Sequence, residues 1–165
     1  MRIGVTGHQA REGIDWAWVR AITLNELKQI ESPSCGLTSL AVGSDQVFAE
    51  VALALGIPVL AVLPFADYEA CFRGESLARY RELLSRCNVK ILDGGDTTEA
   101  GFFLAGQFIV EKSDVLIAIW DGEPAAGLGG TADVVHHARI KHKSVIHVDP
   151  IRQKIKRFFN SPEGK

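Results

Sequence analysis

Two rhythms of apolar and polar positions alternate along the chain, and each predicts a different kind of element. Short apolar, largely β-branched runs predict strands, at 2–7, 37–42, 57–64, 88–92, 114–120 and 144–148. Apolar residues three and four apart predict helices, at 14–30, 44–56, 99–113 and 131–142, with one or two more in the arginine-rich segment 66–87. Strands that alternate with helices favour a parallel sheet covered on both faces.

This order predicts one α/β domain, a Rossmann-like three-layer sandwich with helices on both faces of a mainly parallel sheet of about six strands. We expect a nucleotide-binding domain over 1–149 and a basic C-terminal helix with a frayed tail over 150–165. The helix at 44–56 has the clearest ends: Ser44 or Asp45 suits its N-cap, and Gly56 suits the position after its last residue.

Composition narrows the class of protein without naming a partner. The 165 residues carry a net charge of −2, and the apolar run at 57–65 is too short to cross a bilayer. The first strand follows the start directly, so we expect no signal peptide and no membrane. The three cysteines are widely spaced, which favours reduced thiols in a cytoplasmic protein.

Candidate chemistry gathers where predicted strands end. Four such ends stand out, with the sequences "TGHQ" (6–9), "VGSDQ" (42–46), "LPFADY" (63–68) and "WDGEPAAGLGGTAD" (120–133). Parallel strands bring these ends to one edge of the sheet, where such folds bind ligands. Two of the ends run through glycine into a helix start, which offers free N–H groups to an anion. Neither matches a Walker A loop, because no lysine follows, and no G-x-G-x-x-G follows the first strand.

We therefore expect a phosphorylated ligand at this edge. The residues predicted to bind it are Gly7, His8, Gln9, Gly43, Ser44, Asp45, Gln46, Pro64, Phe65, Asp121, Gly122, Gly127, Gly129, Gly130 and Thr131. Two readings of Thr131 are compatible, a helix cap and a phosphate contact. Candidate catalytic residues are Asp133, Asp121 and His8, which could act as a carboxylate or as an acid or base. We expect no metal site, because His137 and His142 are five residues apart.

The segments "IGVTGHQ", "LAVGSDQVFAEVALALGIPVLAVLPF" and "SDVLIAIWDGEPAAGLGGTADVVHHA" together resemble the SLOG superfamily. That superfamily joins the LONELY GUY phosphoribohydrolases (once called lysine decarboxylase-like), molybdenum cofactor carriers and the DNA-processing protein A family. The resemblance spans about 2–148 and implies a Rossmann-like domain that binds a nucleotide or a nucleotide-derived ligand.

The chain departs from the phosphoribohydrolase signature at one catalytic position. That signature runs P-G-G-x-G-T-x-x-E, and Gly127, Gly130 and Thr131 match its glycines and threonine. Val134 stands where the glutamate belongs, and Asp133 falls one residue early, about 100° away around the helix. The resemblance thus implies a phosphate cradle and leaves hydrolysis in question.

Three hypotheses follow. The first is a sensor or carrier that binds a nucleotide such as AMP without turnover and needs no other cofactor. The second is an enzyme that cleaves or transfers at the N-glycosidic bond of nucleoside monophosphates. The third, a DNA-binding module, would use the basic end of the chain, where eight Lys and Arg stand against three Asp and Glu from Thr131 onward. The overall acidity argues against nucleic acid. The resemblance also implies a homodimer, for which the apolar helix at 99–112 offers a surface.

Overall fold

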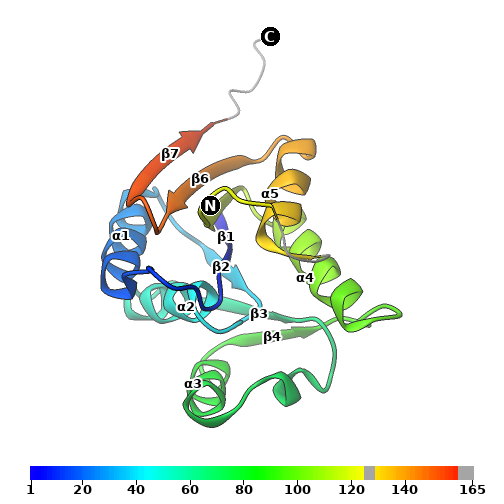
Figure 1. The fold of residues 1–165 in the computed structure, drawn as a ribbon. Helices are drawn as coiled ribbons and strands as arrows, with labels where there is room; N and C mark the ends of the chain where they lie inside the picture. The colour runs from blue at the N-terminus through cyan, green and yellow to red at the C-terminus, as the bar shows by residue number, and fades with distance from the viewer. Residues whose placement is uncertain (125–128, 160–165) are drawn as a thin grey trace.

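The computed structural model describes residues 1–124 and 129–159, which form one seven-stranded sheet between two layers of helices (Figure 1). The strand order is β4-β3-β2-β1-β5-β6-β7. The six strands from β1 to β6 run parallel, and β7 is antiparallel to β6. The strands are β1 Arg2–Gly7, β2 Cys35–Thr38, β3 Val59–Leu63, β4 Asn88–Ile91, β5 Val115–Ile119, β6 Ser144–Asp149 and β7 Lys154–Phe158.

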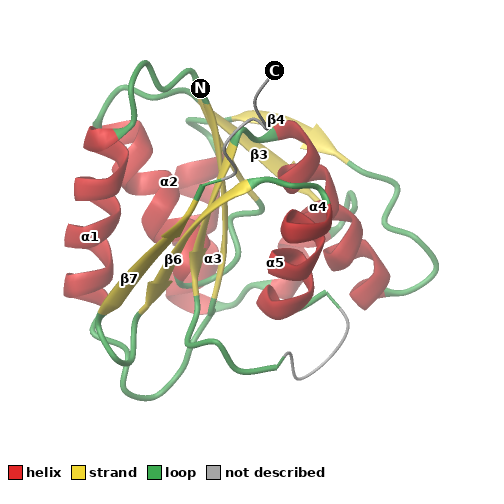
Figure 2. Cartoon of the chain, turned by 90° about the horizontal axis from the view of Figure 1, so that it is seen from above, coloured by secondary structure: helices red, strands yellow, loops and turns green. Residues whose placement is uncertain are grey.

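Helices cover both faces of this sheet, as Figure 2 shows with α1 and α2 on one side and α4 and α5 on the other. The helices are α1 Trp16–Gln29, α2 Ser44–Ala54, the short 3₁₀ helix η1 Tyr68–Cys71, α3 Gly74–Leu84, α4 Thr98–Lys112 and α5 Thr131–Ile140. The predicted Rossmann-like three-layer sandwich is confirmed, with seven strands in place of about six. In the described part of the chain, no helix is long and apolar enough to cross a membrane.

The central strand β5 shows how the sequence builds both layers at once. All five of its residues are buried, because neighbouring side chains point to opposite faces and each face is covered. Ile117 and Ile119 pack in the cluster that contains α1 and α2, while Leu116 and Ala118 pack in the cluster that contains α4 and α5. A strand of this kind reads as an unbroken apolar run, which is why it could be predicted.

The strand order reverses at β1. The chain adds β2, β3 and β4 on one side of β1 and then returns to place β5 on its other side. Connections therefore leave β1 and β5 in opposite directions and open a crevice beyond their carboxyl ends. The loops after these two strands are the ones that the sequence marked with glycine and histidine.

The C-terminal end differs from the prediction. Residues 154–158 form the edge strand β7, so the basic helix predicted for 150–165 is wrong within the described residues, and 160–165 lie outside them. The Arg157 guanidinium donates to both carboxylate oxygens of Glu26 on α1, at 3.1 and 2.5 Å. Glu26 is only 1% exposed. Pairing with β6 and this ion pair together favour a strand over the helix, and lysines suit a sheet edge.

Two boundaries also differ. β2 begins at Cys35 and ends at Thr38, where the apolar pattern predicted 37–42. Gly36 lies within the strand, where the Phe48 ring packs directly against it and leaves little room for a side chain. The chain turns after Thr38. The N-cap of α2 is Gly43, where the sequence predicted Ser44 or Asp45. Gly56 does follow the helix with a positive φ of 72°, as predicted.

Candidate functional site

A cavity of about 410 Å³ lies beyond the carboxyl ends of the strands at the β1–β5 switch point. Its volume falls in the range of small-molecule sites. The loop after β1, the loop after β2, the loop after β5, α4 and the first turn of α5 all contribute to its lining. Seven of the predicted ligand-binding residues lie on it: Gly7, His8, Gln9, Asp45, Gly129, Gly130 and Thr131.

Other predicted contacts lie away from this lining. Pro64 is buried, and Phe65 packs against the rings of Tyr68 and Phe102, which do line the cavity. Gly122 follows Asp121 on the exposed loop after β5 and is not among the lining residues. Gly127 lies outside the described residues.

The turn into α2 binds the chain itself. The Ser44 N–H and hydroxyl both donate to the His8 carbonyl oxygen, at 3.1 and 2.8 Å. Gly43 has a φ of 90°, and a Cβ there would lie 1.9 Å from the Gln9 carbonyl oxygen. The Gln46 side chain donates to the Leu40 carbonyl at 3.2 Å. The donors of this turn thus hold the loops after β1 and β2 in place, and the turn shapes one wall of the cavity.

Asp45 lines the cavity as a buried carboxyl group that organises the loop after β2. Its Oδ2 accepts from the Thr38 hydroxyl at 3.0 Å and from the Ser39 N–H at 2.9 Å. Burial raises the pKa of Asp45 to about 6, and the hydrogen bonds from Thr38, Ser39 and Ala41 limit that rise. The site therefore contains a carboxyl group that gains or loses its proton near neutral pH.

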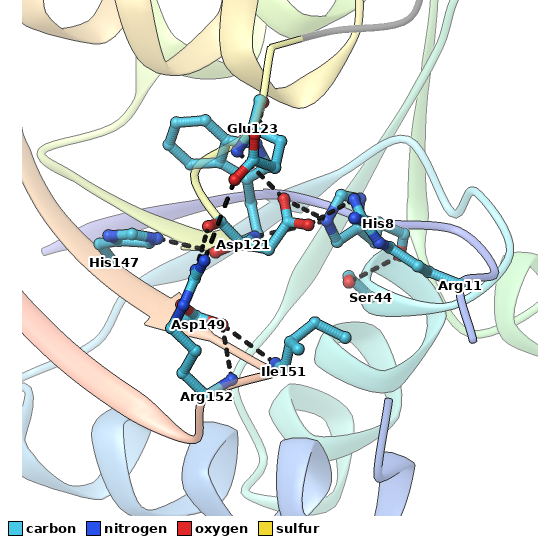
Figure 3. Close-up of polar contacts among 10 residues, drawn as sticks. His8, Arg11, Ser44, Asp121, Glu123, His147, Asp149, Ile151 and Arg152 are labelled. Carbon is cyan, nitrogen blue, oxygen red and sulfur yellow. Dashed lines mark hydrogen bonds and ion pairs between the residues drawn. The ribbon is translucent and has the colours of Figure 1, made fainter. Parts of the chain in front are cut away.

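Asp121, the second residue after β5, is the centre of a polar network that Figure 3 shows. Its Oδ1 lies 3.0 Å from His8 Nε2 and accepts from the Glu123 N–H at 3.1 Å, and its Oδ2 pairs with Arg11. Burial raises the pKa of Asp121, but these hydrogen bonds and the charges of His8 and Arg11 outweigh it and hold the pKa below its usual value. The carboxylate is thus ionised and fully engaged in orienting its neighbours.

The first turn of α5 is built differently from that of α2. Gly129 has a φ of 82°, and its N–H donates to Asp133 Oδ2 at 2.9 Å. Gly130 is the N-cap, and its carbonyl accepts from the N–H groups of Asp133 and Val134. Among residues 1–124 and 129–159, no acceptor is bonded to the N–H groups of Thr131 and Ala132 or to the Thr131 hydroxyl. These residues line the cavity, so the positive end of the α5 dipole opens on it.

Helices α4 and α5 pack too closely for a charged group at position 134. A Cβ added at Gly106 of α4 would lie 2.5 Å from Val134 Cγ2, and Val134 is only 3% exposed. The valine fills the position where the phosphoribohydrolase signature has glutamate. Asp133 does not replace that glutamate, because its carboxylate turns back onto the Gly129 N–H and is not among the lining residues.

Several lining residues were not among the predicted contacts, and those with charged or large aromatic side chains include Arg11, Tyr68, Phe102 and Glu123. Arg11 lies two residues after "TGHQ", Tyr68 is the last residue of "LPFADY", and Glu123 lies in the glycine-rich segment 120–133. Proximity to these strand ends was therefore the available signal for the three residues. Phe102 lies inside an apolar helix, where its pattern did not differ from that of a core residue. In the described part of the chain, no three His, Cys, Asp or Glu side chains gather to hold a metal ion.

Comparisons with known proteins agree on the fold. No family model and no curated protein matches the chain. The X-ray structure of DNA processing protein A from Streptococcus pneumoniae is similar over 90% of this chain, with a TM-score of 0.64 and 16% sequence identity. The chain spans 50% of that protein's length. The X-ray structure of TM1055, a structural genomics target, is similar over 87% of this chain and 71% of its own, with a TM-score of 0.55 and 17% identity.

These likenesses show the fold that the resemblance to the SLOG superfamily implies. The topology adds that the cavity lies at the switch point of the sheet. The chain is thus a Rossmann-like α/β domain with a cavity at the carboxyl edge of its sheet.

Proposed function

We propose that the cavity binds a nucleotide or a nucleotide-derived, phosphoribosyl-type ligand and that the protein acts as a sensor or carrier. The observation that carries the proposal is the first turn of α5, where Thr131 and Ala132 line the cavity and their N–H groups have no bonded acceptor within the described residues. A phosphate placed there would accept from these groups and from the Thr131 hydroxyl. Three aromatic side chains of the lining, Tyr68, Phe102 and Trp120, offer surfaces for a base or ribose.

Binding without turnover is favoured because the carboxylates of Asp133 and Asp121 are both engaged in contacts within the protein. Asp133 is bound to the Gly129 N–H, and Asp121 is bound by His8, Arg11 and the Glu123 N–H. A nucleophile or base must have a lone pair free to reach the substrate. Val134 supplies no carboxylate at the position where the phosphoribohydrolase signature has glutamate.

The test joins binding to turnover. The protein is incubated with AMP and other nucleoside monophosphates, its thermal unfolding is followed, and free base is separated by chromatography. We expect a higher Tm with at least one nucleotide, because ligand binding to the folded state stabilises it, and no release of base. A Tm that no nucleotide raises would refute the proposal, and released base would favour an enzyme.

A second candidate, a phosphoribohydrolase or ribosyltransferase, is favoured by the pair of His8 and Asp121. Their 3.0 Å contact orients an imidazole beside the cavity, as a carboxylate does in many acid–base sites. If base is released, His8→Ala should lower the rate at least 100-fold. A variant rate equal to that of the wild type would exclude His8 as the acid or base.

A DNA-binding module is less well supported, although one similar structure is named a DNA processing protein. The basic end of the chain is largely engaged within the fold. Arg157 binds Glu26, Arg152 binds Asp149, and Lys143 donates to the Ser113 carbonyl at 2.7 Å. These contacts leave fewer cations for phosphates than the sequence suggested.

We also propose that the protein forms a homodimer through α4. Leu104 of this helix is 41% exposed, and Phe103 and Phe108 are half-buried. Sedimentation equilibrium should give twice the monomer mass for the wild type and a smaller mass for Leu104→Glu. A monomeric wild type would refute this assembly.

A further inference from the structure

The loop after β5 is held from the far side by the C-terminal hairpin, which the sequence treated as an appendage. This loop, residues 120–124, contributes Trp120, Glu123 and Pro124 to the cavity. Two of its carbonyl groups accept from side chains of the hairpin region: Trp120 from His147 Nε2 at 2.7 Å, and Asp121 from the Arg152 guanidinium at 2.9 Å. Figure 3 shows both contacts, with Arg152 lying opposite His8 and Arg11 across Asp121.

Arg152 is itself fixed by its own turn. Asp149, at the end of β6, is 6% exposed, and its Oδ1 accepts from the N–H groups of Ile151 and Arg152 at 3.0 and 2.9 Å. Its Oδ2 binds the Arg152 guanidinium at 2.9 Å. Burial raises the pKa of Asp149, but these bonds hold the pKa below its usual value. The guanidinium thus reaches the loop from an ionised, buried anchor.

The hairpin is in turn attached to the body of the fold. β7 pairs with β6 from Val145–Phe158 to Asp149–Lys154, and Arg157 binds the buried Glu26 of α1. The Arg139 guanidinium of α5 lies 5.7 Å from the centre of the Phe158 ring. Contacts to α1, β6 and α5 make this segment a rigid support for whatever Arg152 holds.

Arg152 also affects the charge at the cavity. Its guanidinium lies 4.0 Å from a carboxylate oxygen of Glu123, a lining residue whose side chain is 57% exposed. The backbone of Glu123 makes two hydrogen bonds: its N–H donates to the Asp121 carboxylate, and its carbonyl accepts from Trp120 Nε1 at 2.7 Å. A carboxylate held beside a phosphate site weakens anion binding, and a neighbouring cation reduces that repulsion.

We propose that the β6–β7 hairpin is a working part of the binding site and that Arg152 is its positioning residue. Arg152 holds the 120–124 loop through the Asp121 carbonyl and offsets the negative charge of Glu123. The inference rests on the proposed nucleotide binding, and it gives Arg152, which lies outside the cavity lining, an effect on affinity through the loop and Glu123.

The experiment measures AMP binding by titration calorimetry to the wild type, Arg152→Ala, Arg152→Lys and Lys154→Ala. Lys154→Ala is the matched control, because it removes one positive charge from the same hairpin and has no side-chain partner within the described residues. We expect Arg152→Ala to weaken AMP about tenfold, the effect of one charge-assisted hydrogen bond. Arg152→Lys should lose less, because it keeps the charge, and Lys154→Ala should stay within twofold.

A second arm separates positioning from general stability. Adding Glu123→Gln to Arg152→Ala removes the charge that Arg152 offsets, so we expect it to recover about threefold in affinity. A lowered Tm alone would produce no such recovery. If Arg152→Ala does not fold, Arg152→Lys with and without Glu123→Gln gives the same comparison.

The outcomes distinguish the two proposals. Wild-type binding together with equal affinity in Arg152→Ala and Lys154→Ala would overturn the role of Arg152 and leave nucleotide binding intact. A wild type that binds no nucleoside monophosphate would refute the proposed function, and the role of the hairpin with it.

Discussion

Helices α2 and α5 both start with a glycine followed by a hydroxyl residue and carry an aspartate in the first turn, yet these first turns differ in what they bind. At α2, the Ser44 N–H and hydroxyl are both taken by the His8 carbonyl. At α5, Thr131 and Ala132 line the cavity, and within the described residues no acceptor is bonded to their N–H groups. The pattern therefore marks a helix start and does not show what its N–H groups bind.

The aspartates differ in the same way. Asp45 binds the loop after β2 from a buried position, whereas Asp133 binds the Gly129 N–H at the edge of the α5 turn. Four experiments test this difference between the two helix starts, and they follow in order of decreasing expected effect.

The largest effect should come from Gly43→Ala at the start of α2. The position has a φ of 90°, and the new Cβ would meet the Gln9 carbonyl oxygen at 1.9 Å. Strain and clash together should lower the free energy of unfolding by about 3 kcal/mol, measured by urea denaturation. Gly56→Ala is the matched control, because Gly56 also has a positive φ, of 72°, but a Cβ added there would meet no atom within 4 Å. It should cost about 1 kcal/mol, and equal losses at the two positions would contradict the close approach at Gly43.

The next effect is a pH dependence that comes from Asp45. Its pKa is about 6 in the folded protein against 3.8 for a freely solvated aspartate side chain. The folded state therefore binds the proton more tightly than the unfolded state, so this group's contribution to stability is largest below about pH 4. It falls as the pH rises towards 6, by on the order of 2 kcal/mol.

Urea denaturation of the wild type and Asp45→Asn at pH 4 and pH 7 measures this term. The wild type should lose more stability than the variant between these two values. Asp121 and Asp149 have lowered pKa values and give the opposite trend, but they are common to both proteins and cancel in the difference. A difference that does not change with pH would contradict the burial of Asp45.

Thr131→Val tests the open helix start. The change keeps the shape of the side chain and removes the hydroxyl of a residue that lines the cavity. We expect AMP affinity to fall about tenfold, because a hydrogen bond to a charged phosphate is lost, while the free energy of unfolding stays within about 0.5 kcal/mol. Calorimetric titration and urea denaturation check the two parts, and unchanged affinity would remove Thr131 from the site.

Ser44→Ala should give the reverse result and the smallest effect. It removes one of two hydrogen bonds to the His8 carbonyl and leaves the backbone N–H in place. Stability should fall by about 1 kcal/mol, and AMP affinity should change less than threefold. A large loss of affinity with unchanged stability would show that the two helix starts have been assigned the wrong way round.

Much of the fold could be predicted because its information is local. β5 is an unbroken apolar run, and α4 follows a turn rich in glycine and threonine. β7 could not be predicted in this way, since "KIKRF" is mostly exposed and basic. Its strand form depends on pairing with β6 and on an ion pair between Arg157 and Glu26, which lie 131 residues apart.

The candidate site was predictable to the same extent. Gly7, His8 and Thr131 were marked by strand ends and a helix start, and the fold brings them to one cavity. The role of Ser44 depends on the His8 carbonyl 36 residues away, and that of Arg152 on the carbonyl of Asp121. Such contacts between a side chain and a distant backbone carbonyl leave no trace in the pattern of residues along the chain.

The most direct measurement of the central claim is a titration of the ¹⁵N-labelled protein with AMP, followed by the amide resonances of the two helix starts. The account predicts that the amides of Thr131 and Ala132 shift most, because a phosphate accepts from them, while those of Ser44 and Gln46 stay near their free positions. Shifts centred on residues 43–46, or no shift at either helix start, would contradict it.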